Sequence, residues 1–172
     1  MTIFAWDGEH LVSDKAEFKY GIVVNDKACK LLTFEHNGIT CSIAGAGSTI
    51  DILALRKFIL SAVRSYIGKV DIMNFEIQNP QQYMEMVSTF DEYDSLVVFY
   101  DRKEKTACGY HFGKQPIPLK VTPPYAGGHQ DAVIAAIAAM KAGADAVKAT
   151  QIAVELTCIS QTMKDLDVVI TG

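Results

Sequence analysis

Short apolar runs separated by turn residues fill the first part of the chain, a pattern typical of β-strands. Asp7-Gly8 and Asn37-Gly38 favour tight turns, because Asp, Asn and Gly tolerate the backbone angles that such turns require. Strands are expected over residues 2–6, 9–13, 20–24, 29–34 and 39–44. This region therefore predicts a set of sheet strands.

Helical spacing begins after the small-residue loop at residues 45–47. Ser48-Thr49-Ile50-Asp51 has the form of a capping box, in which Ser48 caps the first turn and Asp51 reaches back. The apolar residues that recur at helical spacing are Ile52, Leu55, Ile59, Ala62, Val63 and Tyr66. Leu53, Leu60 and Ile67 widen this stripe and predict a helix buried on more than one side. A shorter helix is expected over residues 80–90.

The second half of the chain adds a hairpin, two helices and a closing strand. Residues 115–124 contain four prolines, which exclude a helix and predict a crossing at the edge of the domain. The expected strands cover residues 95–100, 107–112 and 167–170, and the expected helices cover 131–140 and 146–160, with Gly143 and Asp145 between them. This order suits antiparallel sheets with helices packed outside, in a single α+β domain over residues 1–172.

Composition narrows the class of protein. The chain has 172 residues, of which 49% are hydrophobic and 21% charged, as in one soluble globular domain. Its net charge of −4 comes without a stripe of Lys and Arg, so nucleic acid is not an expected partner. The longest apolar stretch, residues 132–140, is too short to cross a bilayer, and no secretory leader is recognisable. We therefore expect a cytoplasmic protein without membrane contact.

Cysteine and histidine spacing adds no metal or redox signature. Cys29, Cys41, Cys108 and Cys158 lack CxxC spacing and are expected to be reduced core or strand residues. The histidines His10, His36, His111 and His129 form neither HxxxH nor HExxH. The sequence accordingly indicates no metal and no cofactor.

Thr2 directly follows Met1 at the start of an apolar run. A threonine hydroxyl is a weak nucleophile until a base takes its proton. If Met1 is removed, the new α-amine of Thr2 is such a base, because an α-amine titrates near ~8. Thr2 would then be both nucleophile and base. Threonine is also common in second position without any catalytic role, so the hypothesis depends on other residues.

Three stretches carry a resemblance to a known family: MTIFAWDG with LVSD at the start, AGAGSTID before the first helix, and AGGHQDAVIAAIAAMKAGADAVKATQIAVE near the end. With these stretches the chain resembles the proteasome β-subunit family of N-terminal-nucleophile hydrolases. The most similar branch is the bacterial HslV peptidase, including short phage-encoded relatives. The resemblance implies a four-layer αββα sandwich of two antiparallel sheets flanked by helices. It covers nearly the whole chain and is weakest over residues 68–94.

The same resemblance implies a catalytic set. The nucleophile falls on Thr2, the buried aspartate on Asp14, the lysine on Lys30 (with Lys27 as a less well placed alternative) and the oxyanion glycine on Gly47. A lysine ammonium lowers the pKa of a nearby hydroxyl and amine, and a glycine N–H at a helix N-terminus stabilises developing negative charge. Each residue also has a plain structural role open to it, as turn aspartate, solvated lysine or loop glycine.

Several positions depart from the family pattern. Active relatives usually carry Gly-Ser-Gly before the late helices, and the serine position falls here on Gly127. A supporting aspartate near the end of the last helix falls on Ile159, with Thr157 and Ser160 as substitutes. The residue after the nucleophile is Ile3, where a second threonine is common.

Other side chains offer weaker alternatives. His129 is a candidate general base, although a capping or surface role is the favoured interpretation for a histidine at a helix start. Cys41 or Cys108 would need a nearby histidine to act as a thiol nucleophile. His111 is close to Cys108 in sequence, but the two are expected to face opposite sides of one strand.

Two functions follow from these observations. The first is a proteasome-like threonine peptidase that cleaves peptide bonds with Thr2 after loss of Met1. The second is a catalytically inactive relative that serves as a ring-forming structural or virion assembly protein. The resemblance implies a homo-oligomeric ring, a peptide or protein substrate and an ATP-dependent unfoldase as partner. The expected location is the bacterial cytoplasm, or the host cytoplasm or virion for a phage-encoded chain.

Overall fold

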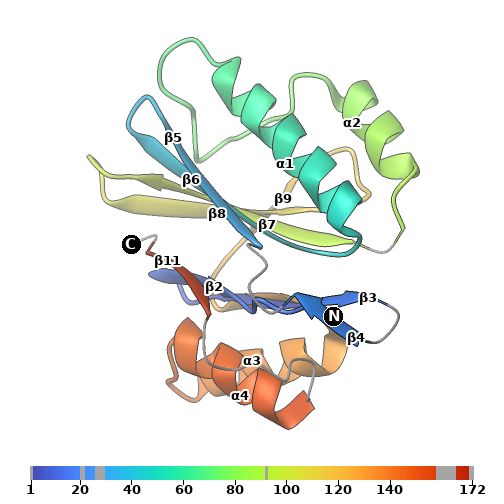
Figure 1. The fold of residues 1–172 in the computed structure, drawn as a ribbon. Helices are drawn as coiled ribbons and strands as arrows, with labels where there is room; N and C mark the ends of the chain where they lie inside the picture. The colour runs from blue at the N-terminus through green and yellow to red at the C-terminus, as the bar shows by residue number, and fades with distance from the viewer. Residues whose placement is uncertain (1, 20–21, 26–29, 92, 158–165, 171–172) are drawn as a thin grey trace.

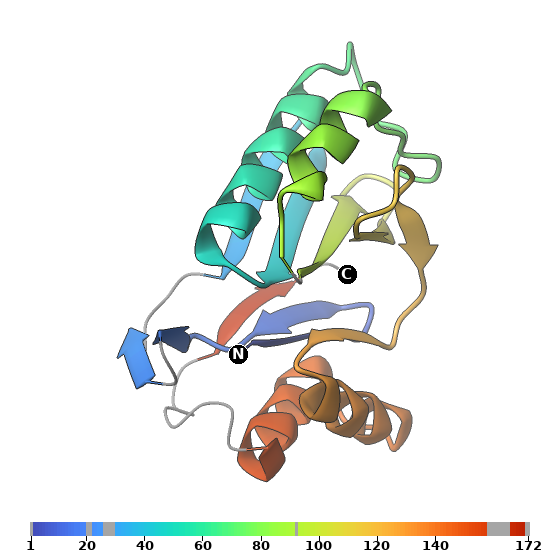
Figure 2. The ribbon, with the colours of Figure 1, turned by 90° about the vertical axis from the view of Figure 1, so that its right-hand side faces the viewer.

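Two β-sheets lie one above the other, and a pair of helices covers the outer face of each sheet (Figures 1 and 2). The structure is a computed structural model that describes residues 2–19, 22–25, 30–91, 93–157 and 166–170. The layers follow the order helices, sheet, sheet, helices. This arrangement confirms the α+β class and the αββα sandwich expected from the sequence.

The first strand belongs to a four-stranded antiparallel sheet with the order β10-β1-β2-β11. Its strands are β1 (Ile3–Trp6), β2 (His10–Ser13), β10 (Tyr125–Gly128) and β11 (Asp167–Ile170). Helices α3 (Gln130–Lys141) and α4 (Ala146–Thr157) cover it. Side chains of β1 alternate: Ile3 and Ala5 pack against these helices, whereas Phe4 and Trp6 face the other sheet.

The second sheet has five antiparallel strands in sequence order. They are β5 (Leu31–His36), β6 (Ile39–Ala46), β7 (Asp94–Asp101), β8 (Thr106–Phe112) and β9 (Leu119–Val121). Helices α1 (Thr49–Arg64) and α2 (Pro80–Ser88) cover its outer face, over a core rich in aromatic rings. A separate hairpin joins β3 (Glu17–Lys19) to β4 (Ile22–Asn25).

Most expected elements are confirmed, with differences where pairing overrides local preference. The strand expected over residues 20–24 is confirmed as β4 from residue 22 on, and residues 20 and 21 lie outside the described residues. Strand β10 has no counterpart among the expectations, because its Gly-Gly pair is typical of a loop. Pairing with β1 holds this segment in an extended strand, although its composition does not favour one. Residues 158–160 of the expected last helix lie outside the described residues.

Two expectations for α1 are wrong. Ser48 is its N-cap residue, but the side chain makes no capping hydrogen bond, since this exposed helix end can be solvated by water. Leu53 is 54% exposed, and Ile67, beyond the helix end, is fully exposed, so the helix buries one face only. None of the helices among the described residues is long and apolar enough to cross a membrane.

Asp7 fastens the β1–β2 turn to the second helix pair. Its carboxylate accepts the N–H groups of Glu9 and His10 at 2.8 and 2.7 Å, and that of Ala146 at the start of α4 at 2.7 Å. Partial burial alone would raise the pKa of Asp7, but the hydrogen bonds from Ala146, His10 and Glu9 outweigh it and lower the pKa. Asp7, predicted from the sequence as a turn residue, therefore also holds the β1–β2 turn against the start of α4.

Candidate active site

Thr2 lies at the head of β1 and is tied to β10 by its backbone. Its carbonyl oxygen accepts the N–H of His129 at 2.8 Å, one residue beyond the Ile3–Gly128 pair. Gly128 has φ +113°, and a Cβ there would lie 2.1 Å from the Thr2 carbonyl oxygen. Only glycine allows the two strands to approach this closely, so the position of Thr2 depends on a residue that is distant in sequence.

Asp14 follows β2 and is buried beside the start of β1, at 2% exposure. One carboxylate oxygen accepts the N–H of Ile3 at 3.0 Å, and the other accepts the N–H of Ala16 at 3.2 Å. The Asp14 N–H in turn donates to the carbonyl of Ile3 at 3.1 Å. Asp14 is thus fixed to the residue immediately after Thr2.

Lys30 brings a positive charge to both residues. It directly precedes β5, and its Nζ lies 2.9 Å from Thr2 Oγ1 and 2.9 Å from Asp14 Oδ2. The side chains of Lys30 and Asp14 are only 12% and 2% exposed, so solvent screens this pair weakly. An ammonium held beside a hydroxyl favours loss of the hydroxyl proton. The alternative lysine, Lys27, lies outside the described residues.

Arg56 is a supporting residue that the sequence reasoning missed. It lies on the buried face of α1, and its Nη2 donates to the carbonyl of Lys30. A guanidinium at this point fixes the backbone from which the Lys30 side chain extends. The available signal was a charged residue at a position where the helical spacing calls for an apolar one.

Gly47 forms the opposite edge of a cleft above Thr2. It connects β6 to the N-cap of α1 with φ +136°, a backbone angle that favours glycine. The cleft has a volume of about 340 Å³ and is lined by Thr2, Ala46, Gly47, Tyr93, Asp94, Gly128 and His129. The adjacent helix N-terminus adds a partial positive charge to this edge.

Gly127, at the position where the resemblance implies a serine, has no room for a side chain. A Cβ on Gly127 would lie 2.2 Å from Cζ of Phe4 and 2.5 Å from Oδ2 of Asp94. Asp94, at the start of β7, therefore fills the space that residue 127 leaves empty. Its Oδ2 accepts the N–H of Gly128 at 3.3 Å, and its Oδ1 lies 2.7 Å from Nε2 of His111.

The remaining departures are partly described. Ile159 and Ser160 lie outside the described residues. The Thr157 hydroxyl donates to the carbonyl of Ala153 at 2.6 Å, within its own helix. Ile3 is fully buried against α3 and α4, which explains an apolar residue after Thr2.

The other candidate nucleophiles and bases lie in different surroundings. Cys41 is fully buried, and burial raises the pKa of its thiol well above the usual value. Cys108 packs in the core beneath α1 and α2, whereas His111 contacts Asp94 from the same strand's opposite face, as expected. His129 occupies the N-cap position of α3 without a side-chain capping bond, and its Nδ1 is buried with no hydrogen-bond partner among the described residues.

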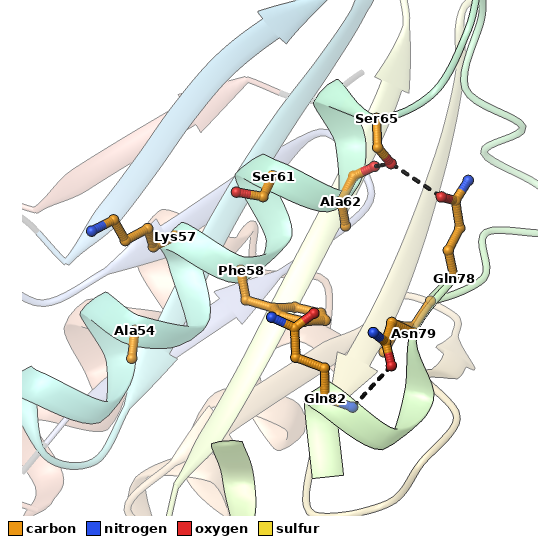
Figure 3. Close-up of a pocket in the computed structure, with 10 residues that line it drawn as sticks. Ala54, Lys57, Phe58, Ser61, Ala62, Ser65, Gln78, Asn79 and Gln82 are labelled. Carbon is orange, nitrogen blue, oxygen red and sulfur yellow. Dashed lines mark hydrogen bonds between the residues drawn. The ribbon is translucent and has the colours of Figure 1, made fainter. Parts of the chain in front are cut away.

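A second pocket lies between α1 and α2, in the outer layer of the five-stranded half (Figure 3). It has a volume of about 480 Å³, and Ser65 donates to Gln78 across it at 3.3 Å. Neither Thr2 nor Lys30 lines it, so its size does not make it the reaction site. Across the described residues, no group of three His, Cys, Asp or Glu side chains is placed to hold a metal.

Comparison with solved structures gives matches over the whole chain. Eukaryotic HslV from Trypanosoma brucei aligns with a TM-score of 0.61 and 21% identity, over 99% of this chain and 98% of that chain. Anbu, an ancestral beta-subunit from Yersinia bercovieri, aligns with a TM-score of 0.66 and 14% identity, over 99% of this chain and 81% of that one. No family model and no curated protein sequence matches the chain.

These structures define the class of fold. The chain has the N-terminal-nucleophile hydrolase fold, in the proteasome-like form that HslV and Anbu share, and this confirms the resemblance noted in the sequence at the level of fold. At 14–21% identity the comparison establishes architecture, and the chemistry has to be argued from the cleft itself.

Proposed function

We propose that this protein is a proteasome-like threonine peptidase that uses Thr2 as its nucleophile. The observation that carries the proposal is the 2.9 Å contact of Lys30 Nζ with Thr2 Oγ1, made while the same ammonium is held by Asp14. A buried ammonium beside a threonine hydroxyl is costly unless paired, and the pairing here directs the charge at the hydroxyl.

The proposed reaction begins after loss of Met1, when the α-amine of Thr2 is free. The neutral amine takes the Oγ1 proton as Oγ1 attacks the carbonyl carbon of a peptide bond. The oxyanion formed is stabilised by the N–H of Gly47. The amine then returns the proton to the departing amine of the substrate, which leaves an ester on Thr2. Attack by water on this ester releases the second product and restores the hydroxyl.

Lys30 and Asp14 set the charge of the site in this scheme. The ammonium lowers the pKa of both the Thr2 hydroxyl and its α-amine, which keeps the amine neutral near pH 7. Asp14 holds Lys30 charged and, through its bond to the Ile3 N–H, holds the backbone of the nucleophile. One buried carboxylate thus aligns two parts of the reaction centre.

We also propose that copies of the chain assemble into a ring. Support comes from the proteasome-like fold and from large apolar side chains that a single chain leaves uncovered, among them Ile50 and Leu53 on α1. Such a ring would enclose the clefts, with an ATP-dependent unfoldase as a candidate partner. Light scattering on the purified protein measures the assembly mass directly.

Two measurements test the peptidase. The intact mass of protein made in bacteria should show loss of one methionine. A peptide epoxyketone, which reacts with an N-terminal threonine through both hydroxyl and amine, should then add to Thr2 and to no other residue. A Thr2→Ala variant is the control that must remain unlabelled. Full processing without labelling of wild-type protein would contradict the peptidase.

One observation favours the second candidate, an inactive sandwich used as an assembly component. Gly127 stands at the serine position, and Phe4 and Asp94 fill the space of a side chain there. Under this alternative the protein assembles but neither hydrolyses peptides nor reacts with the epoxyketone. The same labelling experiment therefore separates the two functions.

A further inference from the structure

Asp94 lines the same cleft as Thr2 and fills the space that a side chain on residue 127 would need. Its Oδ2 lies 2.5 Å from the place of a Cβ on Gly127, so a carboxylate from β7 takes the room of a side chain from β10. In the β7–β8 register, Leu96 lies opposite His111, and Asp94 is two residues before Leu96 on the same face. The diagonal position explains why the His111 ring reaches the carboxylate.

Two successive backbone amides at the end of β10 link Asp94 to Thr2. The N–H of Gly128 donates to Asp94 Oδ2 at 3.3 Å, and the next N–H, of His129, donates to the Thr2 carbonyl at 2.8 Å. Two successive residues thus hold the carboxylate and the nucleophile. Of the described residues that line the cleft, Asp94 is the one carboxylate.

The positive charge of a protonated Thr2 α-amine would need a carboxylate close to it. Processing at Thr2 adds an α-amine, which carries a positive charge when protonated. Asp14 already accepts hydrogen bonds from Lys30, Ile3 and Ala16. Asp94 lies on the other side, where Oδ1 contacts His111 Nε2 at 2.7 Å without hydrogen-bond alignment. Of the two carboxylates, Asp94 is the one that lines the cleft together with Thr2.

We propose that Asp94, steadied by His111, is the positioning anion for the freed α-amine of Thr2, in the place where relatives use a serine. The inference rests on the proposed function, in which that amine is the base. A carboxylate favours the protonated amine and raises its pKa, whereas Lys30 lowers it. Asp94 therefore keeps the amine basic enough to accept the Oγ1 proton despite the nearby ammonium.

Several groups face this point from the elements packed around it. They are Lys30 and Asp14 beside Thr2, His129 from the start of α3, Tyr93 and His111 from the five-stranded half, and Tyr125 from β10. Tyr93 donates to the carbonyl of Gly113, so its hydroxyl is already engaged.

The test measures the amine itself. The full chain is produced as a fusion from which a specific protease releases Thr2 as first residue, so the amine exists however Met1 is processed. The pH dependence of acylation of Thr2 by acetic anhydride, followed by peptide mass spectrometry, gives the amine pKa. Asp94→Asn, which keeps an oxygen for the Gly128 N–H, should lower the midpoint by about one pH unit.

Asp101→Asn is the matched control, because Asp101 lies at the far end of β7 and pairs with Lys69. It should leave the midpoint unchanged. If Asp94→Asn titrates as wild type while wild type cleaves peptides, the inference is overturned and the peptidase stands. If wild type is inactive but Asp94→Asn still shifts the midpoint, Asp94 holds the amine and the proposed function fails. In an active enzyme the acid limb of kcat/KM should move to lower pH with the amine.

Discussion

The two sides of the Thr2 site differ in how closely they follow the pattern of the family that the chain resembles. On one side the Lys30 ammonium lies 2.9 Å from Thr2 Oγ1 and 2.9 Å from Asp14 Oδ2, in the pattern that the family resemblance implies. On the other side Gly127, Asp94 and His111 form an arrangement that the resemblance does not contain. The first side places an ammonium on a threonine hydroxyl. On the second side a carboxylate from β7 fills the space that a side chain at Gly127 would need.

Lys30→Ala should produce the largest effect, on the side that follows the family pattern. Loss of the ammonium leaves Thr2 Oγ1 without its nearest charge and leaves Asp14 buried and unpaired. We expect peptide hydrolysis to fall by at least ~100-fold, on the scale of losing an acid–base or electrostatic group. Lys69→Ala, which removes a lysine paired with Asp101 away from the cleft, is the control. Hydrolysis at the wild-type rate would show that Lys30 has no catalytic role.

Gly128→Ala tests the close approach of β10 to Thr2. A Cβ would meet the Thr2 carbonyl at 2.1 Å, and φ +113° is strained for alanine. We expect a loss of about 3 kcal/mol or more in the free energy of unfolding, together with loss of activity. Gly143→Ala is matched in φ at +103° but has no atom within 4 Å of the new Cβ, so it should cost less. Urea unfolding followed by circular dichroism measures both variants.

Gly127→Ser introduces the serine that the family pattern has at this position, and so tests whether the Asp94 side of the cleft can accept it. The new side chain would collide with Phe4 and Asp94, so it should destabilise the fold by about 1–3 kcal/mol rather than improve catalysis. Activity and thermal unfolding are measured on the same preparation. A variant that is more active and equally stable would mean that Asp94 does not fill the serine's place.

Asp7→Ala should have the smallest effect and lies outside the cleft. Asp7 accepts the first N–H of α4, and loss of such a cap costs about 1 kcal/mol. The folded-state pKa of Asp7 is lowered, so its stabilisation is fully present above the unfolded value of about 3.9 and is lost as pH falls through the folded value. The stability difference between variant and wild type should therefore be present at pH 7 and shrink below about pH 4. A difference independent of pH would assign the effect to packing.

Hydrophobic spacing and turn residues predicted most of the strands and helices, because these are local signals within one chain. The family resemblance implied their arrangement as a sandwich. The family resemblance named Thr2, Asp14, Lys30 and Gly47. In the structure Lys30 contacts both Thr2 and Asp14, and Thr2 and Gly47 line one cleft. Asp94 was not named, because its partner His111 lies on the neighbouring strand and its space is left by Gly127 on the other sheet. Contacts between sheets have no signature in local spacing. Arg56 did carry a local signal, as a charged residue on the apolar face of its helix, but its partner Lys30 is distant in sequence.

The hydrogen bond that closes the β1–β10 ladder is accepted by the carbonyl of Thr2, and Lys30 reaches its hydroxyl. Removal of Met1 changes only the backbone nitrogen of Thr2. The contacts of the Thr2 carbonyl and hydroxyl therefore involve no atom that this cleavage alters. The sandwich can consequently form before or after maturation. An aminopeptidase working on the nascent chain and one working on the finished domain would deliver the same scaffold. In the proposed peptidase, access to the chain end would then decide when activity begins.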